Sequence, residues 1–351
     1  MRVTPRRKNR MIIVITVPAL IVVITAAMPG RSLVWNSPWT QFQNGKDDYH
    51  RGNFIGAEQA WTQALASAPK NAEEEIAFAR ISYCLGCLYA DQGRYKEAIP
   101  LLNSAFNVRK KYLGQAHPYT TLTQSTLATV HAAQGKFTLA EPLFVDVLRT
   151  RQQYLGDKDL TTLTAMSNLA DLYVSEKRYT LAEPMCKEAF SSTLKYYGES
   201  HPETVISMNN LAAIYQLQGR YSDAETLFKK SLKITETLFG RMNRDTAISM
   251  NNLALCYKVQ GRYEEAETLS KDAVRIGRKL FGDRHPQTAS FMDRLAGIYL
   301  CENRYREAGL LYEQAFHIQE SALGSQNPKT IDSLKNLKLA NNQLKETTGK
   351  F

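Results

Sequence analysis

The sequence contains little of the material from which catalytic and metal sites are usually built. Its 351 residues include only five cysteines and six histidines, and it has no phosphate-binding loop, nucleophile elbow or paired-carboxylate arrangement. The one close thiol pair, Cys84 and Cys87, has no second pair with which to complete a zinc site. We interpret this pair as packing residues, with redox activity as the alternative. We expect no catalytic residues, no metal and no other cofactor, and we predict that the protein is not an enzyme.

Most of the chain also lacks a marked excess of basic over acidic residues. The formal net charge is +10, but five basic residues and no acid fall within the first ten positions. The excess that remains is ordinary for a globular domain. We therefore do not expect nucleic-acid binding.

Long hydrophobic runs are absent except for one, at residues 11–28, which reads MIIVITVPALIVVITAAM. As a helix, this segment would extend over roughly 27 Å, close to the hydrocarbon thickness of a bilayer. The basic residues 1–10 predict an amino terminus in the cytoplasm, and Trp35 and Trp39 stand where an interfacial aromatic belt is expected. We expect a retained transmembrane signal-anchor helix, a single-pass membrane protein, and repeats on the extracytoplasmic, periplasmic or lumenal side.

Two other interpretations of this segment stay open. It could be a signal peptide cleaved after Thr25-Ala26-Ala27, although its apolar core exceeds the usual length of about 7 to 15 residues. The arginine-rich, acid-free start is also compatible with a protein of the mitochondrial inner membrane.

An internal repeat dominates the rest of the chain. Residues 207–240 read SMNNLAAIYQLQGRYSDAETLFKKSLKITETLFG, and 42 residues later the chain reads SMNNLALCYKVQGRYEEAETLSKDAVRIGRKLFG. The same step separates seven leucines and six glycines, namely Leu85, Leu127, Leu169, Leu211, Leu253, Leu295 and Leu337, and Gly114, Gly156, Gly198, Gly240, Gly282 and Gly324. A constant period of this size is typical of stacked helical repeats.

Each repeat predicts a pair of helices. Met208, Leu211, Ala212 and Tyr215 occupy positions i, i+3, i+4 and i+7, which form one apolar stripe of a helix. Gly219 ends that helix, because glycine takes the left-handed conformation without penalty. A second apolar stripe follows after a turn of about three residues, which predicts an antiparallel helix hairpin. A single hairpin cannot cover its own apolar faces, so neighbouring hairpins must stack on it.

The spacing of Leu, Ala or Gly, Tyr, Gly, Tyr, Ala, Phe and Ala in each unit resembles the tetratricopeptide repeat. The 42-residue period, the Asn-Leu-Ala start and the closing Leu-Phe-Gly or Tyr-Leu-Gly before His-Pro resemble its kinesin-light-chain subclass. The resemblance covers roughly residues 79 to 340. It implies an all-α, right-handed superhelical solenoid of antiparallel hairpins, to which the hydrophobic run would add one transmembrane helix. The heptad coiled coil of a kinesin subunit is missing.

We predict the order of segments from these patterns. The His-Pro pairs place proline as the first residue of a helix, and Asn71 with the acids after it predicts a helix start. The first helices of the six full units are expected to start near residues 79, 121, 163, 205, 247 and 289. The segments are a basic stretch 1–10, the anchor 11–28, a linker 29–40, a capping repeat 41–70, six repeats 71–328, a capping helix 329–346 and a tail 347–351.

The polar residues just before the repeat leucines indicate a binding surface. They lie about 100° around the helix from the core leucine and so face the concave inner wall of the superhelix. Asn168, Asn210 and Asn252 match the asparagine ladder of tetratricopeptide superhelices. In two units a second asparagine, Asn209 or Asn251, stands directly before the first. An asparagine amide offers both a donor and an acceptor to a peptide backbone. The alternative is that these asparagines cap or bridge neighbouring helices.

Two basic residues are expected on the same wall. Lys258 and Arg294 could hold an acidic side chain or a terminal carboxylate; the alternative is solvated helix surface. The predicted peptide-binding residues are Asn168, Asn209, Asn210, Asn251, Asn252, Lys258 and Arg294.

One basic residue stands in the tight turn of each unit, and we interpret this set as solvated turn residues. Its members are Arg94, Lys136, Arg178, Arg220, Arg262 and Arg304.

These features together favour a protein interaction function. We expect a membrane-tethered scaffold or assembly factor that binds extended protein segments in its concave groove. The alternative is a regulatory receptor that binds a short peptide or small ligand in the same groove.

Overall fold

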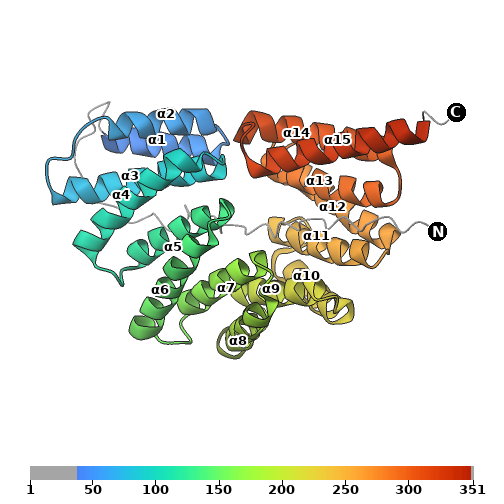
Figure 1. Cartoon of the computed structure of the whole chain (residues 1–351), viewed down its shortest axis with the longest axis horizontal. Helices are drawn as coiled ribbons and strands as arrows, with labels where there is room; N and C mark the ends of the chain where they lie inside the picture. The colour runs from blue at the N-terminus through green and yellow to red at the C-terminus, as the bar shows by residue number, and fades with distance from the viewer. Residues whose placement is uncertain (1–37, 349–351) are drawn as a thin grey trace. The chain divides into compact units, whose positions relative to one another are not determined.

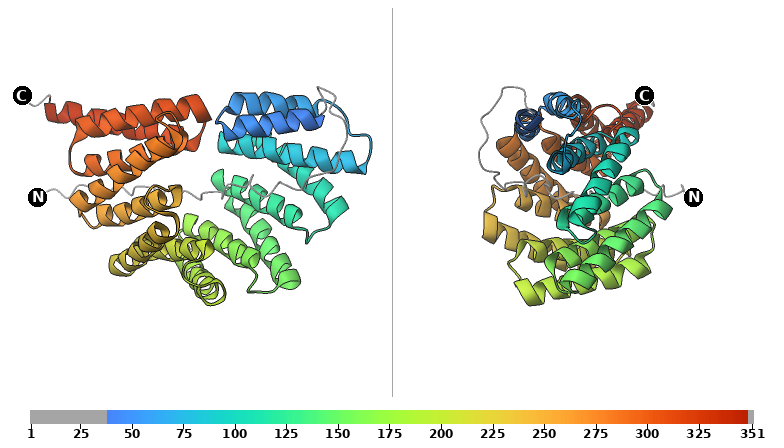
Figure 2. Two further views of the ribbon diagram at one scale, coloured as in Figure 1. Left: turned by 180° about the vertical axis from the view of Figure 1, so that it is seen from behind. Right: turned by 90° about the vertical axis from the view of Figure 1, so that its left-hand side faces the viewer.

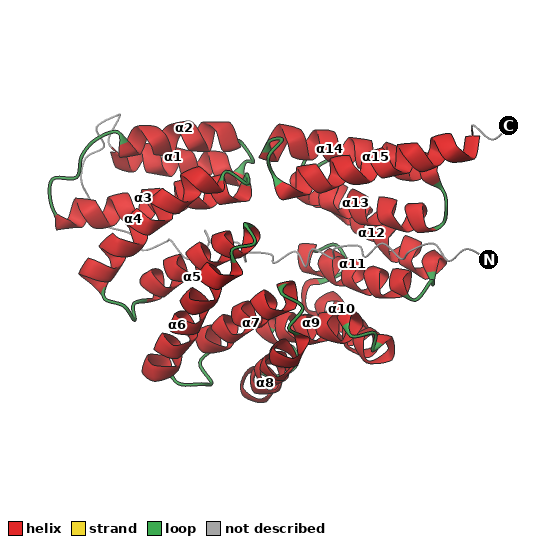
Figure 3. Cartoon of the chain, in the orientation of Figure 1, coloured by secondary structure: helices red, strands yellow, loops and turns green. Residues whose placement is uncertain are grey.

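The structure is a computed structural model that describes residues 38–348. These residues form fifteen α-helices and no strand (Figures 1 and 3). The predicted all-helical solenoid of antiparallel hairpins is confirmed over this range. In chain order the helices are α1 (Pro38–His50), α2 (Phe54–Leu65), α3 (Ala72–Asp91), α4 (Tyr95–Leu113), α5 (Pro118–Ala133), α6 (Phe137–Leu155), α7 (Leu160–Ser175), α8 (Tyr179–Tyr197), α9 (Pro202–Leu217), α10 (Tyr221–Phe239), α11 (Arg244–Val259), α12 (Tyr263–Phe281), α13 (Pro286–Cys301), α14 (Tyr305–Leu323) and α15 (Pro328–Thr348).

The prediction of a single-pass membrane protein has to be corrected. Between residues 38 and 348, no helix is long and apolar enough to cross a membrane. The helices in this range are amphipathic, and they carry charged or polar side chains on their exposed faces. The predicted anchor at residues 11–28, the basic residues 1–10 before it and the alternative cleavage site all lie outside the described residues.

The first helix of each unit begins earlier than the apolar stripe suggested. Residues 118, 160, 202, 244 and 286 start α5, α7, α9, α11 and α13, because a polar capping turn precedes the first apolar position. His117, His201 and His285 cap three of these helices, each Nδ1 accepting from a backbone N–H at 3.0–3.2 Å. The predicted helix start at Asn71 is confirmed, since its Oδ1 accepts from Glu74 N at 2.9 Å.

The turn inside each hairpin requires a left-handed residue. Gly219 takes this position with a φ of 81°, and α9 ends at Leu217 just before it, as predicted. At the equivalent positions Lys177 and Asn303 have φ values of 63° and 62°. Asparagine tolerates this conformation better than lysine, so the fold imposes strain of about 1 kcal/mol at Lys177.

Stacking of the hairpins buries apolar side chains in clusters that neighbouring units share. Ala212 and Phe228 from one unit pack with Leu253, Ala254 and Tyr257 from the next, and each set repeats along the chain. The first helices of successive units also contact one another, from α3 with α5 to α13 with α15. The second helices make no comparable contact among themselves within the described residues. The odd-numbered helices therefore form the inner wall of the solenoid and the even-numbered helices its outer wall (Figures 1 and 2).

Five of the six turn cations bind the preceding unit instead of being merely solvated. Each arginine pairs with a glutamate on the preceding second helix, at 2.7–3.0 Å. Each also lies over a tyrosine ring at the end of its own first helix, 3.9–4.4 Å from the centroid. The arginine side chains are 29–42% exposed, which is too little for free surface groups. We call this arrangement the turn clamp; its members are Glu58, Tyr89 and Arg94; Glu141, Tyr173 and Arg178; Glu183, Tyr215 and Arg220; Glu225, Tyr257 and Arg262; and Glu267, Tyr299 and Arg304.

A long-range contact joins the second hairpin to the start of the last helix. Asn327, which is 4% exposed, donates from Nδ2 to the backbone carbonyl of Asp91. A Cβ atom added to Gly93 would lie only 2.5 Å from the backbone oxygen of Gln326. The α3–α4 turn and the α14–α15 turn are therefore in close contact, and we call this the closure contact (Figure 1).

Candidate functional site

Three asparagines occupy the same position on consecutive inner helices. Asn168 lies on α7, Asn210 on α9 and Asn252 on α11, and each precedes a buried repeat leucine. All three side chains are partly accessible to solvent. Within residues 38–348, none of the three amides takes part in a side-chain hydrogen bond. An amide in this state keeps both its donor and its acceptor available to a ligand.

A second row of asparagines lies one residue earlier on α9 and α11, and its Asn251 is less accessible than Asn252. Asn251 is 2% exposed, and its Nδ2 donates to the backbone oxygen of Ala247 at 3.3 Å. The Oδ1 atoms of Asn209 and Asn251 are buried and have no hydrogen-bond partner among the described residues. Buried acceptors are paired in the great majority of proteins. These oxygens are therefore able to accept a hydrogen bond from an incoming donor.

The same row continues with an acid. Asp293 stands 42 residues after Asn251, and the helical phase of the sequence already places it on or near the groove, although it is not among the predicted peptide-binding residues. Its Oδ2 accepts from Gln319 Nε2 at 2.6 Å and from Ser333 Oγ at 2.7 Å, while its Oδ1 has no partner in the described part of the chain. Burial raises the pKa of Asp293 to about 7.

Two unpaired cations lie at the carboxy-terminal side of these asparagines. Neither Lys258 on α11 nor Arg294 on α13 has an ion pair with any residue between 38 and 348, and both are partly buried. A Cβ added to Gly297 would lie 3.5 Å from Lys258 Nζ, which places the lysine against α13. Desolvation lowers the pKa of both groups, and the charge of Arg294 lowers the pKa of Lys258 further. An anion placed between them would relieve this repulsion.

The amino-terminal side of the surface has the opposite character. Asp171 lies on α7, one turn after Asn168, and burial raises its pKa to about 7. The inner wall thus changes from an acid on α7, through asparagines on α9 and α11, to Lys258 on α11 and Arg294 on α13, where Asp293 adds one further acid. Such a gradient would orient a ligand whose ends differ in charge.

The thiols and histidines do not form a reactive site in the described residues. Cys84 is 2% exposed, and burial raises its pKa to about 11, so its thiol stays protonated. Burial also raises the pKa of Cys87, and both cysteines are free. No group of three or more His, Cys, Asp or Glu residues that could hold a metal ion occurs in residues 38–348.

Comparison with protein families gives one match. The family described as tetratricopeptide repeat matches residues 77–153, 119–179, 161–237 and 245–321. These segments together cover more than half of the chain. No curated protein matches the sequence.

Solved structures of several helical-repeat proteins are similar to this chain. The apo form of RapI has a TM-score of 0.56 at 17% identity, covering 81% of this chain and 97% of its own. BtubC (BKLC) from P. vanneervenii has a TM-score of 0.50 at 20% identity, covering 68% and 92%. The nearly identical repeats of a kinesin-light-chain-type protein from Podosopora anserina have a TM-score of 0.47 at 24% identity, covering 58% and 97%.

At these identities RapI and BtubC support the fold alone, whereas the family match extends over four segments of the sequence, of which the first three overlap. Together with the stacked 42-residue hairpins, it shows that the chain belongs to the tetratricopeptide repeat family.

Proposed function

We propose that the protein is an interaction scaffold or assembly factor that binds an extended segment of a partner protein along α7, α9, α11 and α13. The observation that carries the proposal is the row of three unpaired amides, Asn168, Asn210 and Asn252, on neighbouring inner helices. Amides at regular intervals suit a peptide backbone, which presents donors and acceptors regardless of its sequence.

The spacing of the helices sets the length of the segment. Packed helices lie about 8–10 Å apart, so the three amides span roughly 20 Å and Arg294 extends the surface to roughly 30 Å. An extended chain advances about 3.3 Å per residue. The bound segment would therefore contain about nine residues.

The charges favour one orientation of that segment. An acidic side chain or the terminal carboxylate would lie between Lys258 and Arg294, where two unpaired cations repel each other. A basic or neutral stretch would lie near Asp171 on α7. The unpaired Oδ1 atoms of Asn209 and Asn251 would accept from backbone N–H groups or from ordered water along the same path.

A paired affinity purification with cross-linking tests this proposal. The variant Asn168→Ala/Asn210→Ala/Asn252→Ala should bind the recovered partner about 100-fold more weakly, because each amide contributes about 1 kcal/mol through its hydrogen bonds. The matched control is Asn103→Ala/Asn107→Ala, which removes exposed asparagines from the outer helix α4. It should bind normally.

Two results would contradict the proposal. Equal recovery with the triple variant, at unchanged helicity and melting temperature, would mean that the asparagines are structural. Recovery of a small extractable molecule in place of a protein would favour the receptor alternative, in which a short peptide or small ligand occupies the same residues.

A further inference from the structure

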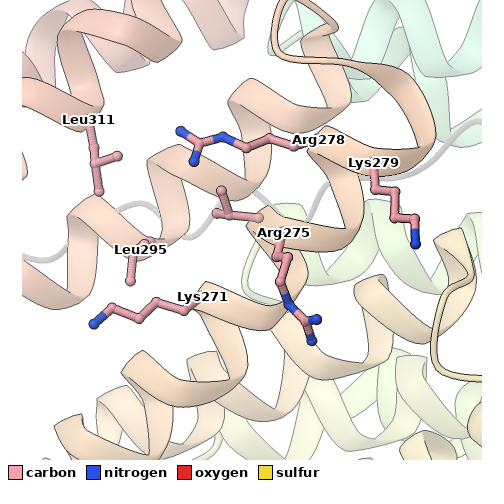
Figure 4. Close-up of a pocket in the computed structure, with 7 residues that line it drawn as sticks. Lys271, Arg275, Arg278, Lys279, Leu295 and Leu311 are labelled. Carbon is pink, nitrogen blue, oxygen red and sulfur yellow. The ribbon is translucent and has the colours of Figure 1, made fainter.

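A second surface is formed mainly by the outer helices α12 and α14, and no asparagine lines it. It is a cleft of about 650 Å³ lined by residues of α12, α13 and α14 (Figure 4). Val274 and Leu295 are each 5% exposed, and together with Leu311 they supply its apolar lining. Four exposed cations from α12 complete the lining, namely Lys271, Arg275, Arg278 and Lys279. We call this surface the basic cleft.

The repeat itself shows that these charges are not needed for folding. The apolar positions recur 42 residues away, as Leu232 for Val274 and Leu253 for Leu295. The basic positions do not recur as a set, because the second helix of no other unit carries a cation at all four. The equivalent residues are Lys229, Lys233, Glu236 and Thr237 on α10, and Glu313, His317, Glu320 and Ser321 on α14. A departure confined to one unit of a repeating framework indicates a role other than stacking.

The existing ion pairs leave this positive charge available. Lys271 Nζ pairs with Glu267 at 2.7 Å, and Arg275 Nη2 pairs with Asp272 at 2.9 Å. Arg278 uses only its Nε, toward Asp283 at 3.1 Å. Lys279 has no ion pair among the described residues. Exposed pairs of this kind contribute little, so an incoming carboxylate can share or replace them.

The geometry also limits what could bind. Figure 4 shows Lys271 and Arg278 at different turns of α12, and both side chains extend toward Leu295 and Leu311. Seven residues separate the two cations, which corresponds to roughly 10 Å along the helix. A lone phosphate group is too small to reach both, and it would leave Leu311 uncovered. A helix with acids at i and i+7 and an apolar residue between them fits both features.

We propose that the basic cleft binds an acidic amphipathic helix of a partner protein. Two of its carboxylates would lie on Lys271 and Arg278, and the apolar side chain between them would pack on Leu311, above the buried Val274 and Leu295. Six of its seven lining residues lie on the outer helices α12 and α14, and none is a predicted groove residue, so it can be occupied while a segment is bound along the inner wall. The proposal is independent of the groove function.

A peptide-display selection on the full chain tests the basic cleft. A random library is selected on the unaltered protein and counter-selected on Lys271→Glu/Arg278→Glu. The selected peptides should carry two acids seven residues apart with an apolar residue between them. Their affinity, measured by fluorescence anisotropy, should fall about 30-fold in the charge-reversed variant and should decrease with added salt.

The neighbouring unit provides a matched control. Lys229 pairs with Glu225 at 2.7 Å, just as Lys271 pairs with Glu267, so Lys229→Glu/Lys233→Glu makes the same change of charge one unit away. This control and the triple asparagine variant should each bind the selected peptides within about twofold of the unaltered protein. If Lys271→Glu/Arg278→Glu fails to fold, the neutral variant Lys271→Gln/Arg278→Gln replaces it, with about a fivefold expected loss.

Three outcomes would overturn the proposal. The selected peptides could lack the paired acids, they could bind the charge-reversed variant equally well, or no peptide could be selected. A parallel assay with phosphatidylserine vesicles covers the remaining case. Vesicle binding that depends on Lys271 and Arg278, without peptide binding, would assign the cleft to an anionic lipid surface instead.

Discussion

At the scale of single residues, Asp171 shows how the stacked repeats affect the chemistry of one group. Its carboxyl has no side-chain hydrogen-bond partner among residues 38–348, and burial raises its pKa from the ordinary 3.8 to about 7. Between these two values, the folded state binds more protons than the unfolded state. The free energy of unfolding should therefore fall as the pH rises from about 4 to about 7.

The variant Asp171→Asn removes this dependence. We expect it to match the wild type near pH 4 and to be more stable by about 1 kcal/mol at pH 8, a value reduced from the full linkage because the carboxyl is partly exposed. Denaturant unfolding from pH 4 to pH 8 measures the difference. Asp157→Asn, at an exposed site, is the control. Parallel pH profiles for the wild type and Asp171→Asn would contradict the assignment.

The identity of the inner-wall residues could be read from the sequence, but their accessibility could not. The 42-residue step places Asn168, Asn210 and Asn252 at one helical position, and the structure finds them on consecutive inner helices. The row that starts one residue earlier is different, because Asn251 is almost fully buried. A shift of one residue turns a side chain by about 100°, and only the neighbouring unit decides which of the two positions stays open.

At the scale of helices and hairpins, the turn clamp ties each unit to the one before it. The internal alignment of the repeats contains the same information. Wherever the preceding second helix carries the glutamate, the turn carries arginine, as for Glu225 and Arg262. Where that helix has Ile99 instead, the turn carries Lys136. The substitution of both members together indicates a contact between them.

Removing one clamp should weaken the stacking of two units. We expect Arg262→Gln to lower the free energy of unfolding measurably, since it loses the ion pair with Glu225 and a contact with the Tyr257 ring. The equivalent change Lys136→Gln should cost no more than about 0.5 kcal/mol, because Lys136 is exposed and unclamped. Urea denaturation followed by circular dichroism distinguishes them. Equal losses would mean that the clamp is not a stabilising contact.

The presence of each helix hairpin could be predicted from the sequence, whereas the ends of the helices and the turn clamp could not. The apolar period predicts the hairpins and a turn glycine marks most of them, since both are local properties; Lys177 and Asn303 take the place of that glycine in two hairpins. The helix starts were placed too late because polar caps such as His201 precede the apolar stripe. The clamp was taken for solvated surface, because its two partners lie 37 residues apart and each taken alone is an ordinary exposed charge.

At the scale of the whole repeat array, the closure contact depends on how the small rotations of successive units add up. Its partners Asp91 and Asn327 lie 236 residues apart, and no local pattern in the sequence connects them. The pitch of the array brings the α3–α4 turn against the α14–α15 turn. The closure contact depends on rotations summed over six units, so the sequence of one unit could not predict it.

Two glycine substitutions distinguish the effect of breaking the closure contact from the effect of backbone strain in a turn. Gly93 and Gly219 both have left-handed φ values, 74° and 81°, so alanine should cost each turn about 1 kcal/mol. Only at Gly93 would the new Cβ meet another part of the chain, the backbone of Gln326; at Gly219 nothing lies within 4 Å. We expect Gly93→Ala to increase the radius of gyration measured by small-angle X-ray scattering, and Gly219→Ala to leave it unchanged. An unchanged radius for both would show that the closure contact does not hold the array together.

The closure contact also determines how a bound segment would enter and leave. Residues 91 to 327, joined by it, form a closed loop of chain that contains the helices of the inner wall. A partner segment on that wall would be threaded through the loop if its two ends left by opposite openings. A free chain end could slip in directly, whereas a segment flanked by folded domains could enter only after the contact between Asp91 and Asn327 breaks. The residence time of such a partner would then be governed by the rate at which the repeat array opens, as much as by the affinity of the asparagines.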